Sequence, residues 1–386
     1  MSTFSFPGGT ATILQRNDLA ASGEWSRAFR SQCKDHRYYE IIEQTLANDF
    51  QYQYLLLRDT AGAVRGIQPF FFVQQNLVEG IPGGFRQMAE KVRRAFPRFL
   101  TMRMLMVGCA AGEGHMGNFA SADLPWLADA LHAVLPAIAR GGKASLIALK
   151  DFSSKYRDVL GCFSSNGYAR VPSMPMTRLA LNYRDFDDYL AGLGYATRKS
   201  LRRKFRKIDR AAEITREITS DITPYIDEVY PLYLAVHERS PMKFETLTKE
   251  YLRQVGREMP ERTRYFIWRI EGCIVAFSLC FVHDGTIYDE YLGLDYSVAL
   301  DLHLYFHTIR DILSWAIENG LTFYCSSPLN YDPKLHLGFE LAPLDLYVRH
   351  SRAVLNPIFG RVVKWLEPTR HDAVLRRFPN AAELWG

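Results

Sequence analysis

The chain has 386 residues, of which 48% are apolar and 23% are charged, and its formal net charge is +5. This length is too great for one ordinary hydrophobic core and suits two cores of about 180 residues each. The composition is that of a folded globular protein, which excludes long disordered spans, and no apolar run reaches the roughly 18 residues that span a bilayer. The N-terminus lacks the pattern of a secretion signal, so we expect a cytoplasmic protein.

Strand-like and helix-like runs alternate in the first half of the chain. Apolar runs predict strands at Gln53–Leu57, Ile67–Val73, Leu105–Val107 and Ser145–Leu149, a helix at Trp126–Ala139, and a closing pair of strands near Tyr168–Val171 and Thr177–Leu181. We expect all of these strands to form one sheet.

The glycine-rich segment Val107–Phe119 invites comparison with a phosphate-binding loop. It lacks the Gly-Lys-Ser/Thr of a P-loop and the spacing of a dinucleotide fingerprint, so we interpret it as a connecting loop. From this loop Glu113 and His115 are candidate substrate contacts in a cleft between the two halves.

The segment Gly83–Arg103 combines six basic residues with several aromatic and aliphatic ones. Such a segment is either a surface helix broken at Pro97 or a contact with an anionic membrane surface. Both interpretations remain open, and the second would place the protein peripherally at the inner face of the membrane.

Residues Arg198–Arg210 include eight lysines and arginines in thirteen positions. Leu201, Phe205 and Ile208 recur at helical spacing, which predicts an amphipathic helix with its apolar stripe on the protein. The cations repel one another at i,i+3 and i,i+4 spacing, and a helix made only for solubility would interleave acids. We therefore expect the helix to bind an anion, with CoA phosphates, an aminoacyl-tRNA backbone and an anionic lipid surface as the alternatives.

The stretch from Thr263 to Phe339 carries the clearest pattern. Three strands joined by tight turns, a helix, a fourth strand and a polar loop are predicted in that order, at Tyr265–Ile270, Ile274–Val282, Thr286–Leu294, Asp301–Asn319, Thr322–Cys325 and Ser326–His336. Asp289 and Glu290 are adjacent on the third strand, so they point to opposite faces and only one of them faces a cleft. The polar loop should lie at the C-terminal end of the sheet, where ligands often bind.

This order of elements resembles the GNAT acyltransferase superfamily, and more closely its Fem-type branch, in which two GNAT-like domains occur in tandem. The basic helix and the Tyr331-Asp332-Pro333-Lys334 sequence carry the closer resemblance. It implies an α+β fold of two tandem GNAT-like domains, each a mixed, mostly antiparallel twisted sheet flanked by helices. The implied divisions are an N-terminal domain, a catalytic domain preceded by the basic helix, and a C-terminal tail packed on the body, at 1–182, 183–353 with the helix at 197–213, and 354–386.

The resemblance implies formation of an amide by transfer of an acyl or aminoacyl group to an amino group. The donor would be acyl-CoA, an acyl carrier protein thioester or aminoacyl-tRNA, bound as a co-substrate. Amide formation needs a base for the attacking amine and an acid for the leaving group, for which the candidates are Asp289, Glu290, Tyr331 and Lys334. Candidate donor contacts are Arg198, Arg202, Arg203, Arg206, Leu292, Leu294 and His303, and candidate substrate contacts in the polar loop are Ser326, Ser327, Asn330 and His336.

Two features of the sequence bear on these expectations. The turn between the third strand and the helix, Asp295–His303, contains no glycine, whereas GNAT proteins usually bind the cofactor pyrophosphate at a glycine-rich turn there. A non-catalytic binding protein of this fold is therefore one alternative, and a Fem-type transferase acting on a lipid-linked cell-wall precursor is the other. His303 and His307 have the spacing of metal ligands, but no third ligand accompanies them, and the six cysteines show no metal-binding spacing, so we expect no metal and reduced thiols.

Overall fold

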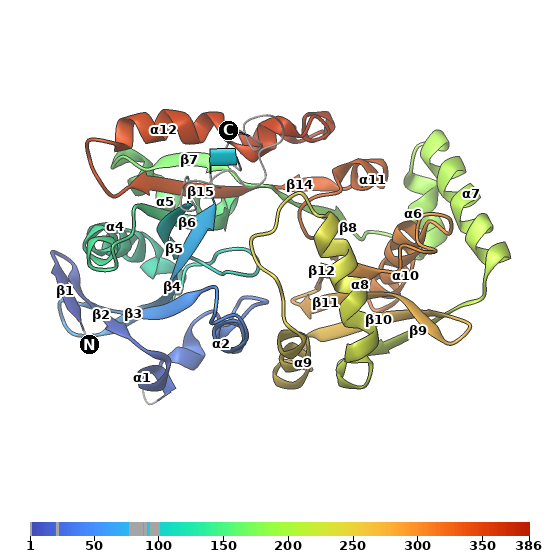
Figure 1. Cartoon of the computed structure of the whole chain (residues 1–386), viewed down its shortest axis with the longest axis horizontal. Coiled ribbons are helices and arrows are strands. Elements are labelled where there is room, and N and C mark those ends of the chain that lie inside the picture. Colours follow the sequence, from blue (N-terminus) through green and yellow to red (C-terminus); the bar gives the residue numbers. More distant parts are fainter. Residues whose placement is uncertain (1, 21–22, 77–87, 89–90, 93–100) are drawn as a thin grey trace.

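The computed structural model describes the chain except for residues 1, 21–22, 77–87, 89–90 and 93–100. Two twisted sheets lie side by side along the long axis of the molecule (Figure 1). The strand order is β1-β2-β3-β4-β5-β6-β15-β7 in the first sheet and β14-β8-β13-β12-β11-β10-β9 in the second. Most neighbours are antiparallel, while the pairs β5–β6 and β12–β13 are parallel. The expected α+β class is confirmed.

The first sheet has a helical layer on each face. Its strands are β1 (Thr3–Phe6), β2 (Gly9–Leu14), β3 (Gln51–Asp59), β4 (Val64–Asn76), β5 (Thr101–Val107), β6 (Leu146–Ser153), β7 (Ala169–Pro172) and β15 (Leu344–His350). Its helices are α1 (Arg16–Ala20), α2 (His36–Thr45), α4 (Leu124–Gly141), α5 (Arg157–Ser165) and α12 (Asn356–Trp365). The apolar face of α4 packs with α5 on one side of the sheet, and α2 covers the side that faces the second sheet.

The second sheet is also covered on both faces. Its strands are β8 (Met176–Ala180), β9 (Ile214–Thr219), β10 (Thr263–Ile270), β11 (Cys273–His283), β12 (Thr286–Leu294), β13 (Phe323–Ser326) and β14 (Glu340–Ala342). Its helices are α6 (Phe186–Gly192), α7 (Tyr195–Ala211), α8 (Ile226–Arg239), α9 (Lys249–Glu258), α10 (Leu304–Glu318) and α11 (Tyr331–His336). One apolar core runs from α2 to α8 and α9, and so joins the two halves.

Two strands cross between the halves of the chain. β15 comes from the C-terminal part of the sequence but lies between β6 and β7 of the first sheet. β8 precedes the second half yet lies between β13 and β14 of the second sheet. The expectation that residues 177–181 close the first sheet is therefore wrong, because the chain leaves that sheet after β7.

The three-strand meander is confirmed as β10, β11 and β12. The helix that follows starts later than expected, at Leu304 instead of Asp301, after His303 in a left-handed conformation with φ of 51°. The polar loop after β13 contains a short helix, α11. Segment 83–103 lies largely outside the described residues, so its alternatives remain predictions.

The amphipathic character of α7 is confirmed. Leu201, Phe205 and Ile208 are buried against the second sheet, and most of the basic side chains are exposed. All six cysteines are free thiols, of which four are buried and Cys273 is exposed. Within the described ranges, no helix combines the length and the hydropathy needed to cross a membrane.

Candidate active site at the junction of the two sheets

The parallel strands β12 and β13 stop pairing partway along β12, and the point where their pairing ends is called the opening below. The two parallel strands are in register from Thr286 opposite Phe323 to Asp289 opposite Ser326, and Ser327 N donates to Asp289 O at 3.0 Å. β12 continues to Leu294, whereas β13 ends at Ser326. The C-terminal edge where parallel strands separate is the usual ligand position in open sheets.

A β-bulge places Glu290 at this opening. Cys280 of β11 pairs with Asp289 and Leu279 pairs with Tyr291, so no residue of β11 opposes Glu290. A bulge of this kind redirects a side chain and is common beside active sites. Gly293 of the same strand allows the backbone of α8 to approach closely, because a Cβ there would lie 2.8 Å from Tyr233 N.

The two adjacent carboxylates have different partners, as expected for opposite faces of a strand. Asp289 accepts hydrogen bonds from Ser278 Oγ and from Tyr324 Oη, the latter at 2.7 Å. Glu290 Oε1 accepts from Lys34 Nζ at 2.9 Å. Burial raises the pKa of Asp289, and its hydroxyl partners counteract the shift only in part.

Lys34 forms the centre of a buried ion cluster that spans the two halves of the chain. Its Nζ lies 2.7 Å from Glu113 Oε2 as well as 2.9 Å from Glu290 Oε1, and its side chain is 1% exposed. Glu113 also lies 3.3 Å from His115 Nε2, while His115 Nδ1 is buried without a hydrogen-bond partner. With two carboxylates and one ammonium, the cluster is net negative when His115 is neutral.

The shifts in pKa within the cluster follow from these contacts. Burial would lower the pKa of Lys34, but the two carboxylates raise it well above its ordinary value. Burial would raise the pKa of Glu113, but Lys34 and His115 lower it overall. Glu290 has only Lys34 as a counter-charge, and burial raises its pKa despite that contact. Glu290 is therefore the carboxylate of the cluster that accepts a proton more readily.

Lys334 lies in α11, shortly after the end of β13, and interacts with Asp289. It is 2% exposed, and its Nζ donates to the carbonyl groups of Ser327 at 2.5 Å and Leu329 at 2.9 Å. Burial lowers the pKa of Lys334 to about 7, and Asp289 opposes the shift. This lysine can therefore exchange a proton near neutral pH.

The other candidate residues of the polar loop have varied positions. Ser326 is buried at the end of β13, and Asn330 is exposed in a left-handed conformation with φ of 51°. Tyr331 is buried, its hydroxyl donates to Pro175 O at 2.8 Å, and burial raises its pKa, which makes it a weak acid. His336 Nδ1 donates to Asp332 O within α11, so this ring is turned to its own helix.

The turn before α10 uses its polar groups internally. Asp295 Oδ1 accepts from the backbone N of Ser297 at 2.9 Å, and Asp295 O accepts from Val298 N and Ala299 N. Leu304 N donates to Ala299 O at 2.9 Å. These amides are therefore committed to the turn, whereas a pyrophosphate-binding turn would present such amides to an anion.

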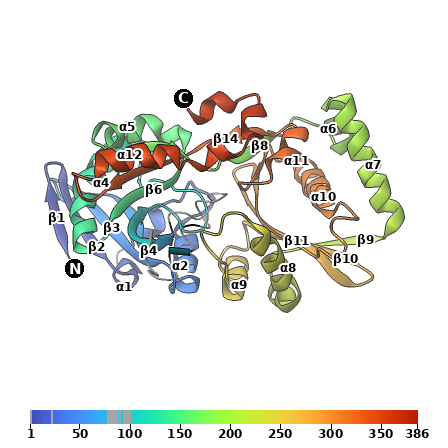
Figure 2. The same ribbon diagram turned by 45° about the horizontal axis from the view of Figure 1, so that its top comes forward.

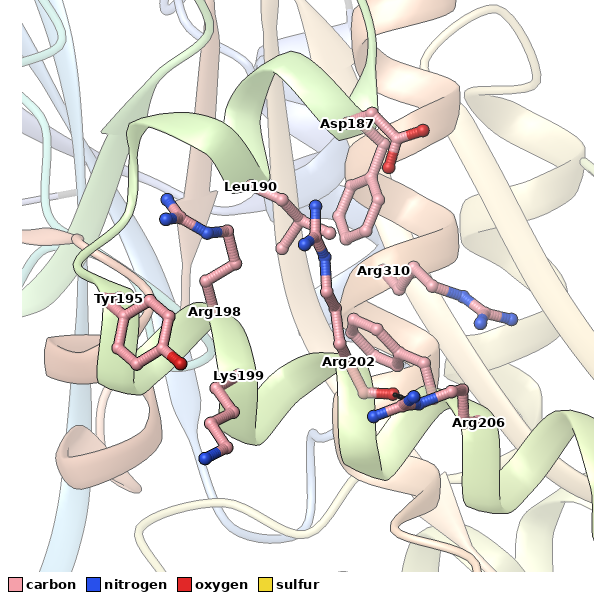
Figure 3. A pocket seen from close by; sticks show the side chains of 10 residues that line it. Asp187, Leu190, Tyr195, Arg198, Lys199, Arg202, Arg206 and Arg310 are labelled. Carbon is pink, nitrogen blue, oxygen red and sulfur yellow. Dashed lines mark hydrogen bonds between the residues drawn. The ribbon is translucent and has the colours of Figure 1, made fainter.

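A cationic groove of about 640 Å³ lies between α6, α7 and α10. Figure 3 shows Arg198, Arg202 and Arg206 along α7 and Arg310 on α10. The groove is lined by Phe186, Asp187, Leu190, Tyr195, Arg198, Lys199, Arg202, Phe205, Arg206 and Arg310. Arg198 is partly committed, since it donates to Ala191 O and Leu193 O at 2.9 Å each.

The remaining candidate donor contacts, which include both surface and buried residues, lie outside the groove. Arg203 does not line the groove; together with Lys204 and Lys207 it lowers the pKa of His303, in addition to the larger effect of partial burial. Lys204 Nζ lies 3.4 Å from the centroid of the Phe306 ring. Leu294 is buried, and Leu292 is half-buried against the same core.

Sequence reasoning did not identify Lys34, Ser278 or Tyr324. Lys34 and Glu290 are 256 positions apart, and nothing in the residues around Lys34 indicates that its ammonium group is buried. The residues that sequence analysis proposed in two separate regions, Glu113 and Glu290, share this lysine. Within the part of the chain that the structure describes, no group of histidine, cysteine and acidic side chains could hold a metal ion.

Part of the chain matches a known protein family. Residues 196–332 match the family described as acetyltransferase (GNAT) domain; the match covers the basic helix and the opening and ends at Asp332, two residues before Lys334. Residues 196–332 in the second half of the chain are therefore similar to a GNAT domain. No curated protein sequence matches the chain.

Solved structures extend this assignment to the whole chain at the level of the fold. The crystal structure of FemX is similar with a TM-score of 0.55 and 11% identity, over 92% of this chain and 99% of that one. The structure of L-PGS from Bacillus licheniformis is similar with a TM-score of 0.50 and 12% identity, over 87% and 97% of the two chains. The predicted resemblance to a Fem-type tandem GNAT protein is confirmed at the level of the fold.

Proposed function

We propose that this protein transfers an acyl or aminoacyl group from a carrier to an amino group and so forms an amide. The observation that carries the proposal is the end of the β12–β13 pairing, where Glu290 bonds to Lys34 on one face of β12 and Asp289, on the other face, interacts with Lys334. A carboxyl group with a raised pKa and a lysine with a lowered pKa, both near the end of one strand pair, match the two proton transfers that amide formation requires.

In the proposed reaction the amine nitrogen attacks the carbonyl carbon of the donor, so that a C–N bond forms and the bond to the carrier sulfur or oxygen breaks. Glu290 accepts the proton from the amine, which its raised pKa favours. The net negative charge of the Lys34 cluster attracts the substrate as an ammonium ion before it loses that proton. Lys334 donates its proton to the leaving group and recovers one from solvent.

The proposal requires the loop over Lys334 to move, because this lysine is 2% exposed. Leu329 and Asn330 are consecutive non-glycine residues with φ of 73° and 51°. Left-handed residues of this kind cost about 1 kcal/mol or more each and often occur at sites that change conformation. Donor binding would replace the two hydrogen bonds that Lys334 makes to this loop.

We further propose that the donor is a thioester of CoA or of a carrier protein, whose phosphates bind the cations of α7. The α7 groove supports this assignment, and so does the neighbouring group of Arg203, Lys204 and Lys207 beside His303. The self-bonded turn at Asp295–Ala299 offers no comparable site, which explains why side chains would take over the role of backbone amides.

Isothermal titration with CoA, several acyl-CoAs and an aminoacyl-tRNA tests the donor class, followed by an acceptor screen with the donor that binds. Binding of a CoA ester with a shallow salt dependence supports a thioester donor, whereas binding of only the tRNA with a steep salt dependence would replace the thioester by aminoacyl-tRNA as the donor.

Variants test the catalytic residues. Glu290→Gln should retain donor binding and lose turnover. Lys334→Ala removes the proposed proton donor. Lys249→Ala, which removes a lysine on α9 whose side chain is partly exposed, is its matched control. Binding of no donor would favour a non-catalytic protein of this fold.

A further inference from the structure

Helix α12 exposes a stripe of large apolar side chains. Val354, Leu355, Ile358, Val362 and Trp365 have 87%, 41%, 62%, 44% and 63% of their surfaces exposed. From Leu355, the N-cap of α12, the spacing is three, four and three, so these four residues lie on one face of the helix, and Val354 lies in the turn just before it. Scattered exposed apolar residues are normal, but a continuous stripe on one helix marks a contact surface.

This stripe is distinct from the face by which α12 is attached to the protein. Phe359 packs against the main core, and its ring lies 6.0 Å from that of His350. Asn356 accepts from His350 N at 2.9 Å and donates to Gly167 O at 2.7 Å. Figures 1 and 2 show α12 as an outermost element over β7 and β15. The stripe is therefore presented outward on a fixed helix.

The charges around the stripe are all positive. Arg352, Arg361 and Lys364 are exposed, and residues 351–366 contain no aspartate or glutamate. The next acid, Glu367, is 3% exposed and receives hydrogen bonds from Thr369, Arg370 and Trp385. An apolar face bordered by cations, with a tryptophan at one end, is the pattern of a helix that lies in the interface of an anionic bilayer.

We infer that α12 docks the protein on the surface of an anionic lipid bilayer, with the apolar stripe inserted at the level of the lipid headgroups and Arg361 and Lys364 on the lipid phosphates. The inference is independent of the proposed reaction, because α12 contributes no residue to the opening between β12 and β13. It places the protein at a membrane surface.

Sedimentation with vesicles tests the inference, using phosphatidylcholine alone and phosphatidylcholine with phosphatidylglycerol in equal parts. The full-length protein should bind only the vesicles that contain phosphatidylglycerol. The double variant Ile358→Ser/Trp365→Ser should bind at least about tenfold more weakly, because two inserted side chains are lost. Leu300→Ser, which removes a side chain that is 72% exposed elsewhere, is the matched control and should bind like the wild type.

A second measurement locates the contact and separates it from vesicle binding by α7. Brominated lipids should quench fluorescence in the wild type more than in Trp365→Phe. Binding that is unchanged in the double variant, or quenching that is equal in the two proteins, would overturn the inference. A dimer that forms without lipid and dissociates in the double variant would also overturn it, since a second copy would then cover the stripe.

Discussion

Two lysines are almost completely buried in this protein, and their environments have opposite effects. Lys34 contacts two carboxylates, which raise its pKa well above the ordinary value, whereas Lys334 contacts two backbone carbonyls and its pKa falls to about 7. Carbonyl dipoles satisfy the hydrogen bonds of an ammonium group but do not repay the loss of its hydration. Burial alone therefore says little about a lysine; the charge of its partners decides whether it serves structure or proton transfer.

The largest effect is expected when Lys34, the lysine paired with two carboxylates, is replaced. Lys34→Met leaves Glu113 and Glu290 buried without a counter-charge, and we expect a loss of about 3–5 kcal/mol in the free energy of unfolding. Urea denaturation measures the change. Adding Glu113→Gln and Glu290→Gln should recover most of it, since no buried charge then remains unpaired. A single variant as stable as the wild type would contradict a structural role for the ion cluster.

The matching change at the other lysine should affect activity more than stability. Lys334→Met keeps a long unbranched side chain but removes the proton donor, so we expect turnover to fall about 100-fold, while two hydrogen bonds to carbonyls are worth about 1 kcal/mol each. Steady-state kinetics with the identified donor, beside urea denaturation, separates the two effects. Lys249→Met is the control, and full activity in Lys334→Met would refute the assigned role.

The two lysines should also differ in their effect on stability as the pH changes. The unfolded chain holds a proton on Lys334 up to its ordinary pKa of 10.5, whereas the folded chain releases it near pH 7. Between these values the unfolded state binds more protons, so the free energy of unfolding rises with pH, by up to about 1.4 kcal/mol per pH unit. Lys34 is protonated in both states up to about pH 10 and adds no slope there.

Urea denaturation from pH 7 to 9.5 measures this effect as the difference between the wild type and Lys334→Met. The wild type should gain stability relative to the variant as the pH rises. Parallel curves would indicate that Lys334 stays charged in the folded protein, and the comparison between the two lysines would then fail.

The smallest effect is expected at the α7 groove, where the cations are exposed to solvent. Arg202→Gln/Arg206→Gln should weaken donor binding about tenfold through the loss of charge-assisted hydrogen bonds, with unfolding unchanged. Titration at low and raised salt measures both the affinity and its salt dependence. Lys249→Gln/Arg257→Gln removes the same charge from α9 and should leave binding unchanged; equal losses in both variants would indicate a general effect of net charge.

Local periodicity predicted those parts of the fold that local forces determine. The meander of β10, β11 and β12 and the stripe of Leu201, Phe205 and Ile208 were predicted almost to the residue, because alternation and helical spacing are written in neighbouring residues. The start of α10 was not predicted. The helix was expected to begin at Asp301, but the turn organised by Asp295 and the left-handed His303 delay it to Leu304.

The candidate site could be predicted only in part, because half of it depends on distant segments. Glu290 and Lys334 were proposed from the strand pattern and from the resemblance to Fem-type proteins. The contact of Lys34 with both Glu113 and Glu290 depends on how the two sheets meet, which no local pattern encodes. The helix α11 in the polar loop likewise depends on tertiary packing, since it buries Tyr331 against Phe378 of the C-terminal tail.

The position of β15 has a consequence for synthesis on the ribosome. β6 and β7 are made early but have no direct pairing with each other, because β15 lies between them and is completed only at His350. Domains that form from continuous segments can fold one after another as they emerge, whereas this first sheet must wait for nearly the whole chain. The two halves are therefore expected to fold as one cooperative unit, and a nascent chain that stops after β7 should expose the edges that β15 would cover.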